Sequence, residues 1–284
     1  MVNILLIAFG IPLMVASFIP SSFLSSLLVL STVVSSTPID RQLSKVVNLP
    51  LEIAQNRQQN ADLAAEIARQ VSVRIVANKG AGSGVIIGRR GQVYTVLTCA
   101  HVVNEGQGNS YSILAPDGRT YSARLVRSVQ FGDRDLALVQ FTSQEDYQVV
   151  EMGDSDNLSI GEQLYAGGFP NWHWVNKDEI ADTRNWGWRA FRLTRGNVGM
   201  IPERSLPRGY QLGYTNEVED GMSGGPVLNS NGQLVGINGR LKFPPQGIQV
   251  YRFADGTAPS QMLYQRMEGL SWAIPIGTFK RMVR

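Results

Sequence analysis

The sequence predicts a mainly β domain, folded as a barrel or a sandwich, that follows an apolar N-terminal segment and a helix. Short runs of β-branched and apolar residues recur from residue 71 onward, which is typical of β-strands. Turn sequences separate many of these runs, and Asp117-Gly118 and Asn231-Gly232 are the clearest, because both central residues of a tight hairpin turn take positive φ. The composition, 43% hydrophobic and 17% charged residues in a chain of 284, is that of a folded globular protein.

Residues 1–36 are expected to be a signal peptide or a membrane anchor, because the first 39 residues contain no charged residue and no histidine. A signal peptide would be removed on export, although the usual basic start is missing. An anchor would need both apolar stretches, 4–15 and 23–34, since neither reaches the ~20 residues of a membrane span. Arg41 and Lys45 would then favour a cytoplasmic body. If the segment is a signal peptide, the protein is expected outside the cytoplasm, either periplasmic or secreted. Anchoring of the protein to the membrane through this segment is the alternative.

The elements that follow are predicted from hydrophobic periodicity. Residues 37–70 form an extension with a helix over 51–70, where apolar residues recur at three- and four-residue spacing. Residues 71–284 form one folded domain, in which Gly80–Gly84 is a flexible turn after the first strand. Strands are expected at 71–77, 85–88, 93–98, 112–115, 121–129, 136–141, 163–166, 191–194, 227–228, 234–237 and 271–274, and a terminal helix at 276–282.

Cysteine content and charge exclude several classes of protein. Cys99 is the only cysteine, so an intramolecular disulfide is impossible. One cysteine and two histidines do not make the paired spacings of a structural zinc site, and the sequence implies no metal and no organic cofactor. The net charge of +3, without a run of like charges, predicts no nucleic-acid partner.

A candidate nucleophile lies in the segment Asp220–Pro226, of sequence DGMSGGP. Gly221, Gly224 and Gly225 give the backbone around Ser223 the freedom to turn tightly and to point N–H groups at an oxyanion. The same glycines also suit an ordinary turn, so the segment needs support from a base and an acid.

The order of residues along the chain selects the base. The segment also fits the GxSxG elbow of α/β-hydrolases, but those enzymes place their histidine after the serine, and no histidine follows Ser223. Of the two upstream histidines, His101 directly follows a predicted strand, whereas His173 lies between two tryptophans and suits packing. The orienting acid is Asp135, which directly precedes an apolar strand, with Asp133 as the alternative.

The order of several motifs resembles that of the trypsin-like peptidases, especially the bacterial high-temperature-requirement proteases, over residues 70–280. The matching segments are Gly82–Ile87, Thr98–Val103, Asp135–Leu138, Gly153–Ser155, Gly221–Val227 and Leu234–Asn238. The resemblance implies two six-stranded antiparallel β-barrels, residues 71–145 and 146–276, with the site between them. It also implies a serine endopeptidase that cleaves protein or peptide substrates through an acyl-enzyme, with the N–H groups of Gly221 and Ser223 as the oxyanion hole.

Specificity is less determined by the sequence. Glu217 lies at the offset from Ser223 where family members of basic specificity carry a pocket acid, and it also suits a solvated acidic loop. Asn238 and Gly239, followed by Arg240, match the strand that pairs with the substrate backbone in the family.

Three departures from the family pattern limit the resemblance. Met222 replaces the acid of animal relatives that pairs with a new N-terminus, so that activation switch is expected to be absent. The animal disulfides are missing, and Cys99 suits a small buried hydrophobe. No residue follows Arg284, so an appended peptide-binding domain is expected to be absent.

Two segments remain without an assigned function. Residues 171–190 hold four of the five tryptophans, which suit packing of a long loop or a recognition surface. Residues 241–269 form an insertion that could wall off the substrate site. An inactive scaffold that binds peptides or proteins is the alternative to an active protease, and a membrane-anchored structural protein is a weaker one. The oligomeric state is not predicted.

Overall fold

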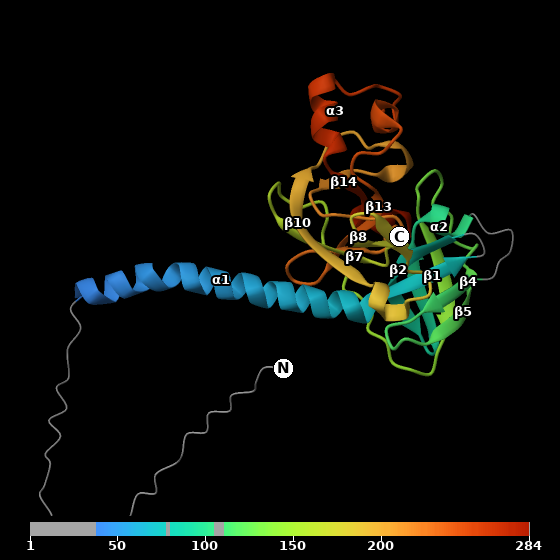
Figure 1. Ribbon diagram of the computed structural model, residues 1–284, viewed down its shortest axis with the longest axis horizontal. Helices are drawn as coiled ribbons and strands as arrows, with labels where there is room; N and C mark the ends of the chain where they lie inside the picture. The colour runs from blue at the N-terminus through green and yellow to red at the C-terminus, as the bar shows by residue number, and fades with distance from the viewer. Residues whose placement is uncertain (1–37, 78–79, 105–110, 284) are drawn as a thin grey trace, which may run out of the picture. The chain divides into compact units, whose positions relative to one another are not determined.

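The computed structural model describes residues 38–77, 80–104 and 111–283 (Figure 1). The chain divides into two units, residues 1–48 and 49–284. The expected signal or anchor segment, residues 1–36, lies outside the described part. Of the helices within the described ranges, none has both the length and the hydropathy that a membrane span requires.

The first helix, α1 (Pro38–Val71), begins well before the predicted residue 51 and continues through Pro50. Within the second unit its last turns carry the buried residues Ala64, Ala68 and Val71, at three- and four-residue spacing. These side chains belong to the same hydrophobic cluster as residues of the second barrel. The C-terminal part of α1 is therefore part of the folded domain.

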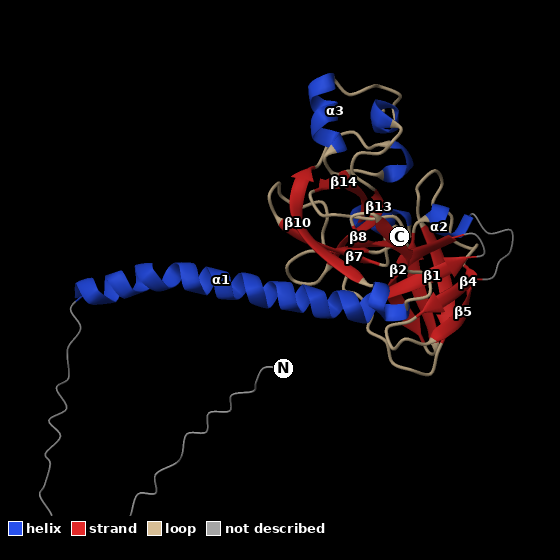
Figure 2. Cartoon of the chain, in the orientation of Figure 1, coloured by secondary structure: helices blue, strands red, loops and turns tan. Residues whose placement is uncertain are grey.

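The first barrel closes in the order β1-β2-β3-β6-β5-β4, with every neighbouring pair antiparallel. Figure 2 draws its strands in red, with β1, β2, β4 and β5 labelled. Its apolar cluster contains alternating residues of these strands, among them Val73, Ile75, Val96 and Val139. The strands are β1 (Ser72–Ala77), β2 (Gly80–Arg90), β3 (Val93–Thr98), β4 (Tyr111–Leu114), β5 (Thr120–Leu125) and β6 (Ala137–Thr142).

The prediction of a flexible turn over Gly80–Gly84 is wrong, because these residues form the start of strand β2. A Cβ on Gly82 would lie 2.6 Å from a methyl group of Val102, and one on Gly84 would lie 2.5 Å from Val96. The glycines therefore serve close packing rather than chain reversal. Such long-range contacts leave no local signal in the sequence.

The second barrel closes in the order β10-β11-β14-β13-β12-β7, again antiparallel. The prediction of two six-stranded antiparallel barrels is thereby confirmed, although β11 was not expected as a strand. The strands are β7 (Gln163–Gly168), β10 (Arg192–Met200), β11 (Leu212–Tyr214), β12 (Pro226–Leu228), β13 (Leu234–Arg240) and β14 (Ser271–Pro275).

Short elements between the barrel strands carry much of the site. Helix α2 (Ala100–Asn104) follows β3, and a two-stranded hairpin, β8 (Trp172–Asn176) and β9 (Glu179–Asp182), follows β7. The insertion at 241–269 contains a 3-10 helix (Gly247–Tyr251) and α3 (Gln261–Glu268). The terminal helix α4 (Ile276–Met282) has the predicted bounds.

Candidate active site

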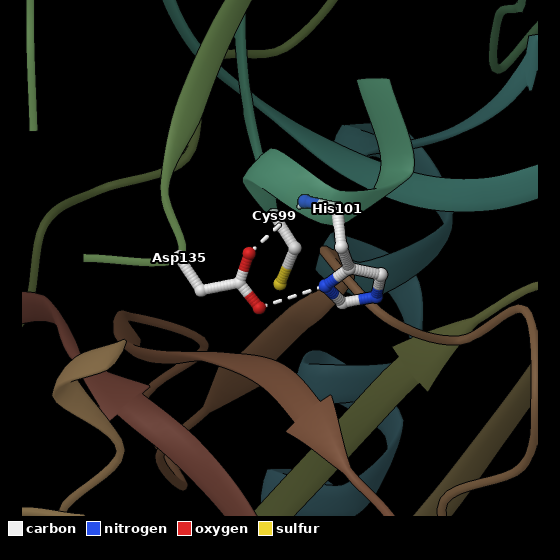
Figure 3. Close-up of side chains that lie close together, drawn as sticks. All are labelled: Cys99, His101 and Asp135. Carbon is white, nitrogen blue, oxygen red and sulfur yellow. Dashed lines mark hydrogen bonds and ion pairs between the residues drawn. The ribbon is translucent and has the colours of Figure 1, made fainter. Parts of the chain in front are cut away.

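His101 and Asp135 form a hydrogen-bonded pair (Figure 3). His101 lies in the first turn of α2, and Asp135 lies just before β6. The His101 Nδ1 atom is 2.7 Å from Asp135 Oδ2, and the His101 backbone N–H donates to Oδ1 at 3.0 Å. Because an ionised carboxylate only accepts hydrogen bonds, Nδ1 carries the proton and Nε2 is left as an acceptor.

The second barrel supplies two more partners to Asp135. Arg208 Nη2 donates to Oδ1 at 2.5 Å, and the Tyr210 hydroxyl donates to Oδ2. The carboxylate is 1% exposed. Burial acts to raise the pKa of Asp135, but the hydrogen bonds from His101 and Tyr210 and the electrostatic interaction with the His101 ring outweigh it, so the pKa is lowered. Asp135 is therefore a buried anion with every oxygen bonded.

Ser223 shares a cavity of about 270 Å³ with His101. Its Oγ donates to the Gly239 carbonyl at 3.3 Å, so its hydroxyl points toward β13 in this conformation. The cavity is lined by Ala77, Gly80, Ala81, His101, Val102, Asn171, Trp172, Arg184, Asp220, Gly221 and Ser223.

The turn that carries Ser223 is held from the first barrel by Ser83. The Ser83 N–H donates to the Ser223 carbonyl and the Ser83 Oγ donates to the Gly221 carbonyl, both at 2.8 Å. Gly221 has φ +94°, in the region that favours glycine, and a Cβ there would lie 2.5 Å from the Phe169 carbonyl oxygen. Among the described residues, the N–H groups of Gly221 and Ser223 have no acceptor, whereas that of Gly224 donates to Asn238. Two neighbouring amides are thus available to an oxyanion.

A buried arginine, Arg74, is connected to this turn through hydrogen bonds. Arg74, on β1 and 1% exposed, donates to the Thr183 carbonyl at 2.8 Å and to Asn171 Oδ1 at 3.2 Å. Asn171 in turn binds Asp220 twice, through its N–H to the backbone carbonyl at 2.7 Å and through Nδ2 to Oδ2 at 3.2 Å. Burial lowers the pKa of Arg74 to about 10, which leaves it charged at neutral pH. A chain of hydrogen bonds therefore connects Arg74 to the residue before Gly221.

Cys99 lies beside the pair, and its sulfur is within 4.8 Å of the His101 and Asp135 ligand atoms (Figure 3). The thiol donates to the Asn238 carbonyl at 3.1 Å and is fully buried. Burial raises the pKa of Cys99 well above its usual range, so the neutral thiol is the stable form. Cys99 is therefore a packed neutral thiol beside the hydrogen-bonded His101–Asp135 pair.

The predicted specificity residues occupy different environments. Asn238 is fully buried, and its side chain donates to the Gly167 carbonyl at 2.8 Å and accepts from the Tyr214 hydroxyl at 2.6 Å. Gly239 offers its carbonyl to Ser223. Glu217 is 75% exposed and forms an ion pair with Lys242. Glu217 is not one of the described residues that line the cavity of Ser223.

The alternatives for base and acid lie apart from this arrangement. His173 is on β8, where Nδ1 is 3.2 Å from Arg192 and the ring packs edge-on against Trp186. Asp133 is 74% exposed and pairs with the adjacent Arg134.

Four residues that build the site were not identified from the sequence as functional. Ser83 lies in the segment Gly82–Ile87, which matches a family motif, but the sequence predicts no role for its side chain. The Gly82-Ser83-Gly84 sequence is the one local signal that points to this serine. The other three residues bind partners that are distant in the sequence, so no local pattern identifies them. Arg74 is 97 residues from Asn171, and Asp135 is 73 residues from Arg208 and 75 from Tyr210.

The chain is similar to known proteins in sequence and in fold. Residues 82–237 match the model of the trypsin-like peptidase domain family. The chain is 32% identical over 203 residues to the periplasmic pH-dependent serine endoprotease DegQ of Escherichia coli, covering 72% of this chain and 39% of the relative. It is 31% identical over 183 residues to the serine protease Do-like HtrA of Bacillus subtilis, covering 62% and 36%.

Among solved structures, a serine endoprotease from Yersinia pestis superposes with a TM-score of 0.53 at 22% identity, covering 78% of this chain and 64% of that one. This similarity supports the fold. The two sequence relatives are much longer than the matched region, since this chain spans less than two fifths of either.

Proposed function

Because this chain belongs to the trypsin-like peptidase family, we propose that it is a serine endopeptidase in which Ser223 is the nucleophile, His101 the base and Asp135 the orienting acid. The observation that carries the proposal is the 2.7 Å hydrogen bond between His101 and the buried Asp135, with His101 lining the same cavity as Ser223. Protein or peptide chains are the proposed substrates, as the names of the relatives indicate for those proteins.

Acylation begins when the Ser223 hydroxyl leaves the Gly239 carbonyl by rotation about its Cα–Cβ bond and turns to His101 Nε2. Ser223 Oγ attacks the carbonyl carbon of the scissile bond while Nε2 takes its proton. The negative charge that develops on the substrate oxygen is stabilised by the N–H groups of Gly221 and Ser223. His101 then gives the proton to the leaving amine, and the C–N bond breaks.

Deacylation repeats these steps with water as the nucleophile. His101 takes a proton from water, the hydroxide attacks the acyl-enzyme, and the proton returns to Ser223 Oγ as the product acid leaves. Asp135 stays ionised throughout and stabilises the imidazolium, a role that its lowered pKa supports.

We further propose that residues 71–284 are the peptidase domain, with barrels at 71–145 and 146–276, behind an extension at 37–70. The name of the E. coli relative and the uncharged N-terminal segment support action outside the cytoplasm. The half of the substrate before the scissile bond is proposed to run beside β13 at Gly239, while the hydrogen bonds of Asn238 favour a supporting role for that side chain.

Labelling with a fluorophosphonate tests the proposed nucleophile. The folded wild type should react at one site, identified by mass spectrometry as Ser223, and Ser223→Ala should not react. The alternative, an inactive scaffold that binds peptides, is favoured if the wild type is folded, binds peptides and remains unlabelled.

Glu217 is proposed to favour basic residues before the scissile bond. Its exposure and its pairing with Lys242 leave that charge available only in part. Cleavage of a peptide library tests this proposal, and absence of enrichment for Arg and Lys would overturn it.

A further inference from the structure

The β8–β9 hairpin presents an exposed apolar face. Trp172, Trp174 and Ile180 are 47%, 61% and 48% exposed. Trp174 pairs with Ile180 across the hairpin, and Trp172 is two residues from Trp174 on the same strand, so the three side chains share one face. We call this the tryptophan face. Neighbouring exposed apolar side chains of this size are typical of interaction surfaces.

The opposite face of the hairpin packs against the domain through His173. His173 packs edge-on against Trp186 at 5.5 Å and contacts Arg192. The base of the hairpin is fixed by Arg74, which binds the Thr183 carbonyl. The hairpin is therefore held in place by its surroundings, while Trp174 and Ile180 stay exposed and Trp172 lies under the Arg184 guanidinium, 5.8 Å from the ring centroid.

The tryptophan face continues directly into the proposed active site. Trp172 lines the same cavity as His101 and Ser223. Of the described residues, those that line this cavity come from the end of β1, the start of β2, α2, the hairpin with its flanking residues, and the turn that carries Ser223, and none comes from β13. Since β13 is the proposed partner of the substrate half before the scissile bond, the cavity lies on the path of the other half.

We propose that the tryptophan face binds apolar or aromatic side chains of the substrate on the C-terminal side of the scissile bond. This inference rests on the proposed function and adds a substrate class to it. Trp174 lies two strand residues, roughly 7 Å, beyond Trp172 along β8. An extended substrate covers about that length in two residues. The preferred apolar side chain is therefore two residues further from the bond than the one that contacts Trp172.

Two kinds of substrate test this proposal on the full chain. Internally quenched peptides carry either Phe and Leu or Asn and Asp at the second to fifth positions after the scissile bond. A short peptidyl ester with the same residues before the bond carries none after it. The quantity measured is the ratio of kcat/KM for the apolar peptide to kcat/KM for the ester, so a general loss of catalysis cancels.

Trp174→Ser and Ile180→Ser should each lower this ratio about tenfold, which corresponds to about 1.4 kcal/mol. Ile160→Ser is the matched control, because Ile160 is 64% exposed in the turn before β7, and it should leave the ratio unchanged. An unchanged ratio in Trp174→Ser and Ile180→Ser, with an active wild type, overturns the inference and leaves the proposed function standing.

Binding to Ser223→Ala gives a readout that does not need catalysis. A peptide with the apolar residues of the leaving half should change the tryptophan fluorescence of Ser223→Ala and bind about tenfold more weakly when Ile180→Ser is added. If the wild type is neither labelled nor active but this binding persists, the proposed function fails while the tryptophan face remains a peptide site. If Ile180→Ser instead converts a dimer into a monomer and leaves peptide binding unchanged, the face is an interface between copies and the inference is wrong.

Discussion

Arg208 forms hydrogen bonds with both the backbone and the side chain of Asp135. Its backbone carbonyl accepts from the Asp135 N–H at 3.0 Å, and its guanidinium donates to Oδ1 at 2.5 Å. Arg208 has φ +68°, an uncommon conformation for a residue other than glycine, which the two bonds support. Because Arg208 belongs to the second barrel and Asp135 to the first, the proposed acid is complete only when both barrels are assembled.

Replacing Arg208 with glutamine is expected to lower kcat/KM by roughly threefold to tenfold. The ion pair is half open to water on the arginine side, which weakens it, and Asp135 keeps its bonds to His101 and Tyr210. Arg281→Gln is the control, since Arg281, on α4, forms an exposed ion pair with Asp156 that this change breaks. Steady-state kinetics on one peptide substrate would measure both, and equal losses would show that Arg208 has no special role.

Asp135→Asn is expected to lower kcat on the order of 10⁴-fold, because an amide fixes the wrong imidazole tautomer. Asp133→Asn should stay within about twofold of the wild type, because its carboxylate is exposed and pairs only with Arg134 among the described side chains. Kinetics of the two variants decide between the two acids that the sequence left open. A larger loss in Asp133→Asn would contradict the proposed assignment.

The lowered pKa of Asp135 also predicts how stability depends on pH. A carboxyl whose pKa is lower in the folded protein contributes stability above its unfolded pKa, about 3.9, and that contribution is lost as the pH falls through the folded value. The difference in unfolding free energy between wild type and Asp135→Asn should therefore be larger at pH 7 than at pH 3. Urea unfolding at both pH values measures it, and a difference independent of pH would show that the Asp135 charge does not contribute.

The parts of this fold that could be predicted are those that local sequence determines. β3 and α4 have the predicted bounds, because strand alternation and a short apolar run define them. Strand Gly80–Arg90 could not be predicted at its start, since Gly82 is required by Val102 on a different element. The triad candidates come from motif order, but Tyr210 is positioned only by closure of the second barrel.

Gly239 illustrates the same limit at the site. A Cβ there would lie 2.1 Å from the Tyr210 ring, so glycine leaves the space through which Tyr210 reaches Asp135. From the sequence, Gly239 was predicted only as a substrate contact. Its role in packing depends on a residue 29 positions earlier and required the folded structure.

Cys99 is expected to resist alkylation in the native protein. Its thiol is fully buried and its pKa is raised, so little thiolate forms and the reagent has no access. Iodoacetamide should add no label under native conditions and one label after denaturation, as counted by mass spectrometry. Ser128→Cys places a second thiol at an exposed position and should be labelled in the native state. Native labelling of Cys99 would show that the site opens.

Arg74→Met is expected to lower kcat about tenfold with little change in KM. Without Arg74, the Thr183 carbonyl and Asn171 Oδ1 lose their buried donor. Asn171 also binds Asp220, the residue before Gly221, so its displacement would shift the Gly221 N–H. Stabilisation of the oxyanion should therefore weaken more than substrate binding. Unsatisfied acceptors should also reduce the unfolding free energy by about 2 kcal/mol. Arg90→Met, at an exposed position on β2, is the control. Arg74→Lys, which keeps a donor and the charge, should recover part of kcat. A purely structural role would instead lower the unfolding free energy and leave kcat of the folded enzyme unchanged.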